Sequence, residues 1–206
     1  MTLHEHVEIY LESVEEGDVL RHCRIGSHNK RKMITDVTID HCEFLFHDFF
    51  KMEMMDSTIS NCDLSNARFE RSILYRNTFE VCKLIGSDFQ QVAAKGSVFR
   101  SCQLTYAAFP DAKLTDVAFV DCQLNDSFFM NATISSTTFK RTAIDNADFS
   151  ESRLAGVDLS DCDFRFIRFD RHLCDGLTIR AAQAASICGT FGIRIAEDEE
   201  HGSSAY

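Results

Sequence analysis

Residues 62–72 read CDLSNARFERS, and the same five-residue pattern returns in NADFSESRLAGVDLSDCDF at residues 146–164. In both stretches a large apolar residue, here called the centre, occupies every fifth position, and a small residue precedes it by two positions. The spacing continues without a slip from Ile34 to Ile179. A period of five fits neither an α-helix nor a flat strand. Repetition at a fixed period is typical of repeat solenoids.

A longer period of twenty residues lies over the period of five. Phenylalanine centres return at this interval from Phe49 to Phe169, and a second series runs from Phe79 to Phe139. The small position repeats in the same way as cysteine, at 42, 62, 82, 102, 122 and 162. Four centres therefore make one turn. The sequence predicts a square, all-β solenoid whose equivalent residues stack at about 4.8 Å.

Two further features agree with this architecture. The second residue after a centre is often Asp, Asn, Gly or Ser, as in Asn61 and Gly86, and these residues suit a sharp corner. The chain has nine cysteines, six of them in the repeated column. Their parallel side chains would keep the Cβ atoms near 4.8 Å apart, beyond the ~3.8 Å typical of a disulfide. We therefore predict reduced cysteines that act as small core residues.

The two quoted stretches resemble the motif of the pentapeptide-repeat family: a small residue, a polar residue, Leu or Phe, and two more polar residues. The resemblance covers about three-quarters of the chain. It implies that residues 34–179 form a right-handed quadrilateral β-helix. It implies no single function, because this fold is a scaffold.

The N-terminal residues 1–33 are predicted to cap the solenoid. Leu3 to Val14 place apolar side chains on one helical stripe, which favours a short amphipathic helix over the first coil. Leu20 and Ile25 fit two quintets in an offset register, with Asp18 and Cys23 at the small position. The basic segment 26–32 is interpreted as a solvated loop, with contact to a phosphate or a partner as the alternative.

The pattern changes again after residue 179. Residues 180–188 are rich in alanine and precede Gly189, which predicts a helix with a glycine stop. Residues 190–195 alternate like a strand. LTIRAAQAASICGTFGIRI (177–195) resembles the C-terminal dimerisation module of Qnr-type quinolone-resistance proteins and their mycobacterial relative. This resemblance implies a homodimer through residues 180–196, with Ile187, Phe191, Ile193 and Ile195 at the interface. The acidic tail 197–206 is predicted to be disordered.

Composition and motifs exclude several classes of function. With a net charge of −11 over 206 residues, direct binding of nucleic acid is not expected. There is no apolar run near 18 residues and no basic-then-apolar leader, so we predict a cytoplasmic protein without membrane contact. His4 and His6 lack zinc-helix spacing, and nucleophile-elbow, phosphate-loop and dinucleotide motifs are absent. We predict no enzyme activity, cofactor or metal.

The acidic surface remains as the candidate site. One group, Asp111, Asp116, Asp121 and Asp126, occupies four successive corners with only Lys113 opposing it. A second group, opposed by Arg153, comprises Asp145, Asp148, Glu151, Asp158, Asp161 and Asp163. The alternative for each residue is a purely structural role, because an Asp side chain at a corner stabilises the turn itself.

Two functions follow from different classes. The Qnr-like resemblance implies a dimeric acidic rod that mimics DNA, binds a type II topoisomerase (DNA gyrase or topoisomerase IV) and confers quinolone resistance. About seven and a half coils give a rod of about 35 Å, and an end-to-end dimer of about 70 Å matches about twenty base pairs. Several drug-protecting relatives carry loops that are missing after residue 34 here, which favours topoisomerase binding over drug protection. The alternative is a structural scaffold for protein interactions without a topoisomerase role.

Overall fold

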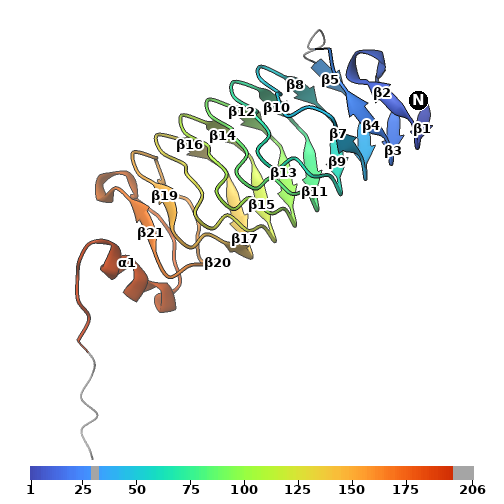
Figure 1. The fold of residues 1–206 in the computed structure, drawn as a ribbon. Helices are drawn as coiled ribbons and strands as arrows, with labels where there is room; N and C mark the ends of the chain where they lie inside the picture. Colours follow the sequence, from blue (N-terminus) through green and yellow to red (C-terminus); the bar gives the residue numbers. More distant parts are fainter. Residues whose placement is uncertain (29–32, 197–206) are drawn as a thin grey trace, which may run out of the picture.

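The computed structural model describes residues 1–28 and 33–196, and the chain winds into an elongated parallel β-solenoid (Figure 1). We number its four faces in chain order from Ile34. Face 1 carries the six-stranded sheet and face 2 the eight-stranded sheet. Face 3 carries the centres in register with Leu64, and face 4 those in register with Phe69. The four-sided solenoid predicted from the sequence is confirmed.

The strands are short and repeat once per coil. Face 2 consists of β1 (Leu3–Glu5), β3 (Val19–Arg21), β6 (Thr38–Asp40), β9 (Thr58–Ser60), β11 (Thr78–Glu80), β13 (Val98–Arg100), β15 (Ala118–Val120) and β17 (Thr138–Lys140). Face 1 consists of β5 (Met33–Thr35), β8 (Glu53–Met55), β10 (Ile73–Tyr75), β12 (Ala93–Lys95), β14 (Lys113–Thr115) and β16 (Thr133–Ser135).

Faces 3 and 4 have fewer regular strands. Face 3 begins with β2 (Glu8–Tyr10), β4 (Arg24–Gly26) and β7 (Glu43–Phe44), and ends with β18 (Thr142–Ala143) and β20 (Cys162–Asp163). Face 4 ends with β19 (Ala147–Phe149) and β21 (Ile167–Phe169). Between these, isolated β-bridges such as Asp63↔Lys83 and Arg68↔Asp88 continue the same register of twenty residues.

The core consists of stacked phenylalanine rings in two columns. On face 4 the ring centroids of Phe89, Phe109 and Phe129 lie 4.7 Å apart and nearly parallel. The face 2 column, from Phe79 to Phe139, has spacings of 4.9, 5.1 and 5.2 Å. Rings of the two columns meet edge to face, a favoured aromatic geometry. One coil therefore supplies two aromatic layers to a narrow, continuous core.

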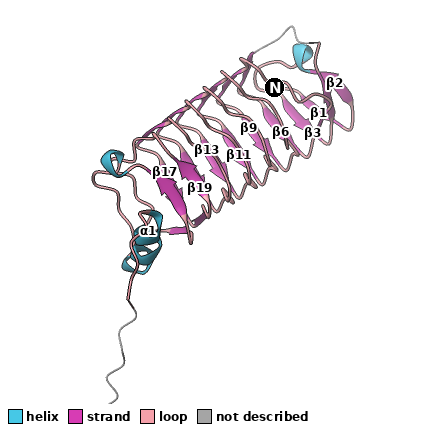
Figure 2. Ribbon diagram, turned by 60° about the vertical axis from the view of Figure 1, so that its left-hand side comes forward, coloured by secondary structure: helices cyan, strands magenta, loops and turns pink. Residues whose placement is uncertain are grey.

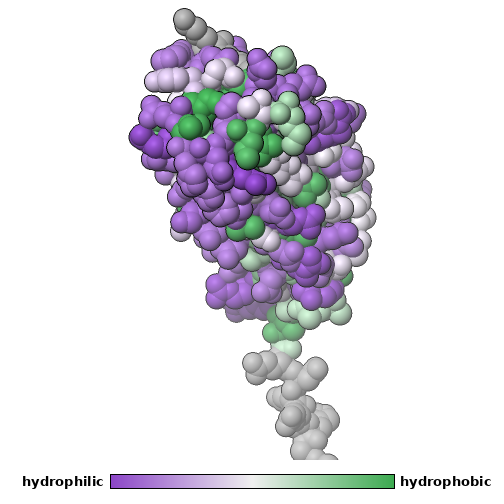
Figure 3. All heavy atoms as spheres, turned by 90° about the vertical axis from the view of Figure 1, so that its right-hand side faces the viewer, coloured by the Kyte–Doolittle hydropathy of each residue, from purple (hydrophilic) through white to green (hydrophobic). Residues whose placement is uncertain are grey.

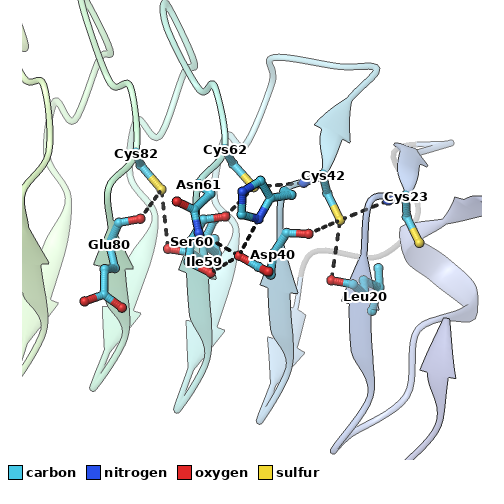
Figure 4. Close-up of polar contacts among 11 residues, drawn as sticks. Leu20, Cys23, Asp40, Cys42, Ile59, Ser60, Asn61, Cys62, Glu80 and Cys82 are labelled. Carbon is cyan, nitrogen blue, oxygen red and sulfur yellow. Dashed lines mark hydrogen bonds and ion pairs between the residues drawn. The ribbon is translucent and has the colours of Figure 1, made fainter. Parts of the chain in front are cut away.

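The cysteine column is also confirmed, and all nine thiols are free. Each buried Sγ–H donates to main-chain carbonyls, as Cys82 does to Ile59 at 3.3 Å and Glu80 at 3.4 Å (Figure 4). Burial raises the pKa of Cys62 and of Cys162 to about 12. Because the thiolate is the reactive form, these thiols are chemically quiet. The column extends one coil further than the repeated period showed, since the main-chain N–H of Cys23 donates to Cys42 Sγ at 3.3 Å.

The predicted N-terminal helix is wrong. Its residues form β1, β2 and the 3-10 turn η1 (Leu11–Ser13), and they add a first coil to the solenoid. β1 pairs with β3, so that His4 lies beside Leu20, and Ile9 of β2 lies beside Ile25. Strand pairing satisfies main-chain groups of the second coil that a helix would leave open. The signal was present, because His4, Ile9 and Val14 continue the spacing of five.

The offset quintets at Leu20 and Ile25 are confirmed, since both side chains are fully buried. Gly26 ends β4 and Ser27 donates to Glu12, but residues 29–32 of the predicted basic loop lie outside the described residues. The two interpretations of that loop therefore stay predictions.

Asp18 closes the N-terminal coil from inside. Its carboxylate is 3% exposed and accepts hydrogen bonds from the N–H of Thr2 (2.9 Å), the N–H of Glu15 (3.0 Å) and His4 Nε2 (3.1 Å). The main-chain bond from Glu15 is the largest cause that lowers the pKa of Asp18 to about 2. A carboxylate held this way stabilises the fold only while it is ionised.

We expect Asp18→Ala to lower the free energy of unfolding by about 2 kcal/mol at neutral pH. A lowered folded-state pKa stabilises the protein above pH 3.8, and this stabilisation is lost as the pH falls towards 2. Urea unfolding of both proteins across this range measures the effect. The gap between them should narrow with acid, and a constant gap would show that the charge of Asp18 contributes nothing.

The C-terminal cap differs from its prediction at the end. The helix predicted over residues 180–188 is present from Ala181, in the 3-10 turn η3 (Ala181–Gln183) and helix α1 (Ala184–Thr190). The predicted stop at Gly189 is wrong, because Gly192 holds the left-handed φ of +70° that ends the helix. There the N–H of Ile193 donates to the Cys188 carbonyl at 2.9 Å, which closes the helix end. The predicted strand at 190–195 is also wrong, since the turn at Gly192 breaks it.

Helix α1 closes the last coil of the solenoid (Figure 1). Gln183 is 5% exposed, and its Nε2 donates to the carbonyls of Leu159 (3.1 Å) and Cys162 (2.8 Å). Thr190 Oγ1 donates to the Ile167 carbonyl at 2.8 Å. A second 3-10 turn, η2 (Arg171–Leu173), precedes this cap. Side chains thus satisfy carbonyls that the last coil would otherwise leave open.

Candidate interaction surface

The first acidic group occupies the corners as predicted. Asp111, Asp116, Asp121 and Asp126 have φ between 54° and 57°, the left-handed backbone that a sharp corner requires. They lie at four different corners of one coil, so they point in four directions around the rod. A partner that approaches from one side therefore contacts at most two of them.

More basic residues oppose the negative charge of this group than the sequence predicted. Lys113 was expected to be the only opposing base, which is wrong. The guanidinium of Arg141, one coil later at the same corner, donates to both carboxylate oxygens of Asp121 at 2.7 and 2.9 Å. This contact lowers the pKa of Asp121.

The other corners of this coil keep more of their charge. Asp111 accepts a hydrogen bond from Asn131 at 2.6 Å, and Asp126 accepts one from Asn146 at 3.2 Å. Both of these partners are neutral. Asp116 is exposed and has no side-chain hydrogen bond or ion pair within the described part of the chain.

The second acidic group is also more strongly paired than predicted, because Arg153 is not its only base. Arg165 donates to Asp145 at 2.7 and 2.9 Å, and Arg168 donates to Asp148 at 2.9 Å. These contacts help to lower the pKa of both carboxylates against the opposing effect of burial. Asp148 is only 7% exposed. Both residues therefore belong to the fold more than to a contact surface.

Two of the remaining acids of this group share a groove with one acid of the first group. Asp121, Asp161 and Asp163 line one shallow groove of about 510 Å³ at the corner between faces 2 and 3. Arg141 and Arg180 line the same groove. Asp158 belongs to face 2 and accepts the N–H of Ser160 at 2.8 Å, while Glu151 lies at a corner of face 4. The structure thus unites three of the predicted acids and separates the others.

An apolar strip was missed by the sequence interpretation. Tyr106, Phe128 and Met130 are 56%, 42% and 45% exposed on two adjacent coils at face 4, where the Ala108↔Phe128 bridge joins them. Asp111 and Asp126 lie at corners next to this strip. The available signal was an aromatic or Met side chain at outward quintet positions, where polar residues are usual. Exposed apolar patches with polar rims often mark protein contacts.

Three histidine rings lie one above another at one corner. The ring centroids of His6 and His22 lie 5.0 Å apart, and those of His22 and His41 lie 5.1 Å apart. A shallow depression of about 660 Å³ is lined by His22, His41, His47 and neighbouring residues. Within residues 1–28 and 33–196, no group of three or more His, Cys, Asp or Glu could hold a metal ion.

The four predicted dimer residues divide into two pairs. Ile187 packs partly buried against the core, and the ring of Phe191 lies edge to face with Phe169 at 5.2 Å. Ile193 and Ile195 are 57% and 60% exposed. The first pair therefore attaches the cap to the solenoid, whereas the second leaves an apolar end.

Apolar residues are also exposed among polar ones at the N-terminal end of the solenoid (Figure 3). Leu3, Val7 and Tyr10 are exposed there by 56%, 44% and 42%. In the described part of the chain, no helix is both long and apolar enough to cross a membrane.

Comparisons with known proteins agree with this geometry. Residues 72–149 match the family model described as a pentapeptide repeat region. The structure of full-length QnrB1, a plasmid-mediated fluoroquinolone resistance protein, is similar with a TM-score of 0.52 and 17% identity, over 93% of this chain and 100% of that chain. HetL, a pentapeptide-repeat protein involved in heterocyst differentiation regulation in the cyanobacterium Nostoc sp. strain PCC 7120, gives a TM-score of 0.31 and 14% identity, over 86% of this chain and 83% of that chain. No curated protein matches the sequence. The chain thus has a parallel β-solenoid fold, and its residues 72–149 match the pentapeptide-repeat family model.

Proposed function

We propose that this protein mimics DNA and binds a type II topoisomerase, DNA gyrase or topoisomerase IV. The observation that carries the proposal is a narrow rod with a net charge of −11 whose corners present carboxylates. A DNA-binding saddle is cationic, and an acidic rod of similar width complements it. The fold similarity to a fluoroquinolone resistance protein supports the choice of partner, and resistance to quinolones is part of the same proposal.

The exposed carboxylates of the C-terminal half of the solenoid are the proposed contact. Asp161 and Asp163 share a groove, and Asp116 and Asp126 have no arginine partner within the described residues. Exposed carboxylates contribute individually little and collectively a salt-sensitive attraction. Displacement of a fluorescent DNA duplex from gyrase, followed by anisotropy at low and raised salt, tests the proposal. Competition that fades with salt supports it, and no displacement at low salt excludes it.

A second candidate, a scaffold for protein interactions, is favoured by the apolar strip of Tyr106, Phe128 and Met130. A contact through these side chains would depend on buried apolar area and would change little with salt. The double variant Phe128→Ser/Met130→Ser separates the two functions. It should leave displacement of DNA from gyrase unchanged if carboxylates carry the binding.

We further propose that two copies associate through the C-terminal cap, because Ile193 and Ile195 extend an apolar end away from the solenoid. Ile193→Asp is expected to convert the dimer to a folded monomer, since a buried unpaired charge at an interface is costly. Light scattering at tens of micromolar measures the mass.

Leu3→Asp is the matched control, because Leu3 is 56% exposed at the opposite end of the rod. It should leave the dimer intact. A wild-type protein that is already monomeric, or a monomer produced by Leu3→Asp alone, would contradict association through the C-terminal cap.

A further inference from the structure

The sheet of face 2 stops one coil before the solenoid does. β17 is its last strand (Figure 2). Asp158 lies twenty residues after Thr138, where the next strand would pair, but its β-bridge is to Thr178 in the following coil. Within the described part of the chain, β17 therefore has no strand partner on this edge.

The main-chain hydrogen bonds between coils change at the same level. One coil earlier, the corner N–H of Asp121 donates to the Lys140 carbonyl at 2.9 Å. At the next level, the N–H of Arg141 donates instead to the carboxylate of Asp161 at 3.2 Å. A side chain here replaces the main-chain contact that joins the other coils.

Asp158 lies on the main-chain segment that faces β17 but does not pair with it. The N–H of Ser160, which would face β17 in a regular ladder, donates to Asp158 Oδ1 at 2.8 Å. The main chain of residues 158–160, opposite β17, thus forms hydrogen bonds with the Asp158 side chain and pairs with the following coil. The strand edge and this wall are left without a direct main-chain ladder between them.

A cleft lies between these two walls. Its volume is about 290 Å³, and it is lined by residues 136–140 on one side and by Gly156, Asp158 and Asp161 on the other. At about 30 Å³ per water, it holds on the order of ten waters, or about two to three residues of extended chain. Main-chain N–H and C=O groups at such a site require a hydrogen-bonding partner.

We propose that this cleft binds a short extended peptide, which adds to the free edge of β17 as one more strand. Strand addition supplies alternating N–H and C=O groups, the complement of an open strand edge. β17 is three residues long, so a segment of about three residues pairs with it. Asp158 and Asp161 outnumber Lys140 around the cleft, which favours a lysine or arginine in the peptide.

The probe is the blocked tripeptide N-acetyl-Val-Lys-Val-amide, titrated into the isotope-labelled full chain and followed by amide NMR. We expect saturable shifts at the amides of Phe139 and Asp158, with millimolar affinity. Phe79 of β11 is the internal reference, because β11 is paired on both edges and should not move.

The matched control is the same peptide methylated on the lysine main-chain nitrogen, which removes one donor and blocks strand pairing. It is expected to bind about tenfold more weakly. Replacement of the lysine by glutamate should also weaken binding. Equal affinity of the methylated peptide, or no saturable shift at Phe139 and Asp158, would overturn the proposal.

Discussion

Replacing Phe109 by alanine is expected to lower the free energy of unfolding by roughly 3–5 kcal/mol. The side chain is 1% exposed, and its ring lies 4.7 Å from the rings of both Phe89 and Phe129. It also meets Phe119 edge to face at 6.0 Å. Truncation therefore removes buried area and leaves a cavity in a narrow core that cannot collapse from several directions.

Phe128→Ala provides the control for this measurement. Phe128 precedes a core phenylalanine on the same face but points outward and is 42% exposed. Phe128→Ala should lower the free energy of unfolding by less than about 1 kcal/mol, as substitutions of exposed residues away from structural features do. Urea unfolding of the three proteins measures both values. A loss below about 1 kcal/mol for Phe109→Ala would contradict the core packing described here.

Neutralising the four corner aspartates of one coil is expected to weaken binding to gyrase by about two- to thirtyfold. The variant changes Asp111, Asp116, Asp121 and Asp126 to asparagine, and it moves the net charge from −11 to −7 because four negative charges are removed. Asparagine retains an acceptor oxygen and tolerates the left-handed corner, so the protein should fold. Exposed ion pairs contribute roughly 0.2–1 kcal/mol each. A partner on one side of the rod contacts at most two of these corners, so the expected loss is about 0.4–2 kcal/mol.

A charge-matched control separates a defined surface from net charge alone. Changing Glu43, Glu53, Glu70 and Glu80 to glutamine removes the same four charges from earlier coils. It should leave most of the gyrase affinity in place. If both variants weaken binding equally, total charge is responsible, and if neither does, the corner carboxylates are not the contact.

Most of the fold was predictable because its determinant is local and repeats. The core position at every fifth residue allows Phe109 or Cys102 to be placed inside from the sequence alone, and both are buried. The N-terminal coil was misinterpreted because Leu3, Val7, Tyr10 and Val14 also satisfy a helical stripe. Pairing with β3 decides between the two structures, and only the neighbouring coil supplies that pairing.

The acidic surface was less predictable, because charge pairing follows the stacking of coils rather than the order of residues. Arg141 lies twenty residues after Asp121 in the sequence but at the same corner in space. The same interval joins Arg165 to Asp145 and Arg168 to Asp148. Applying the period of twenty to outward residues, as well as to the core, would have revealed these pairs. The opening beside β17 has no such sequence signal, since the spacing of five continues through it.

Inhibition of gyrase-catalysed supercoiling by the purified wild-type protein tests the central proposal most directly. DNA mimicry predicts inhibition at low salt that weakens as salt screens the carboxylates and that excess plasmid DNA relieves. The same titration with topoisomerase IV, followed by decatenation, covers the second enzyme of this class. Absence of both inhibition and binding for the two enzymes at low salt would contradict DNA mimicry and leave the scaffold function in its place.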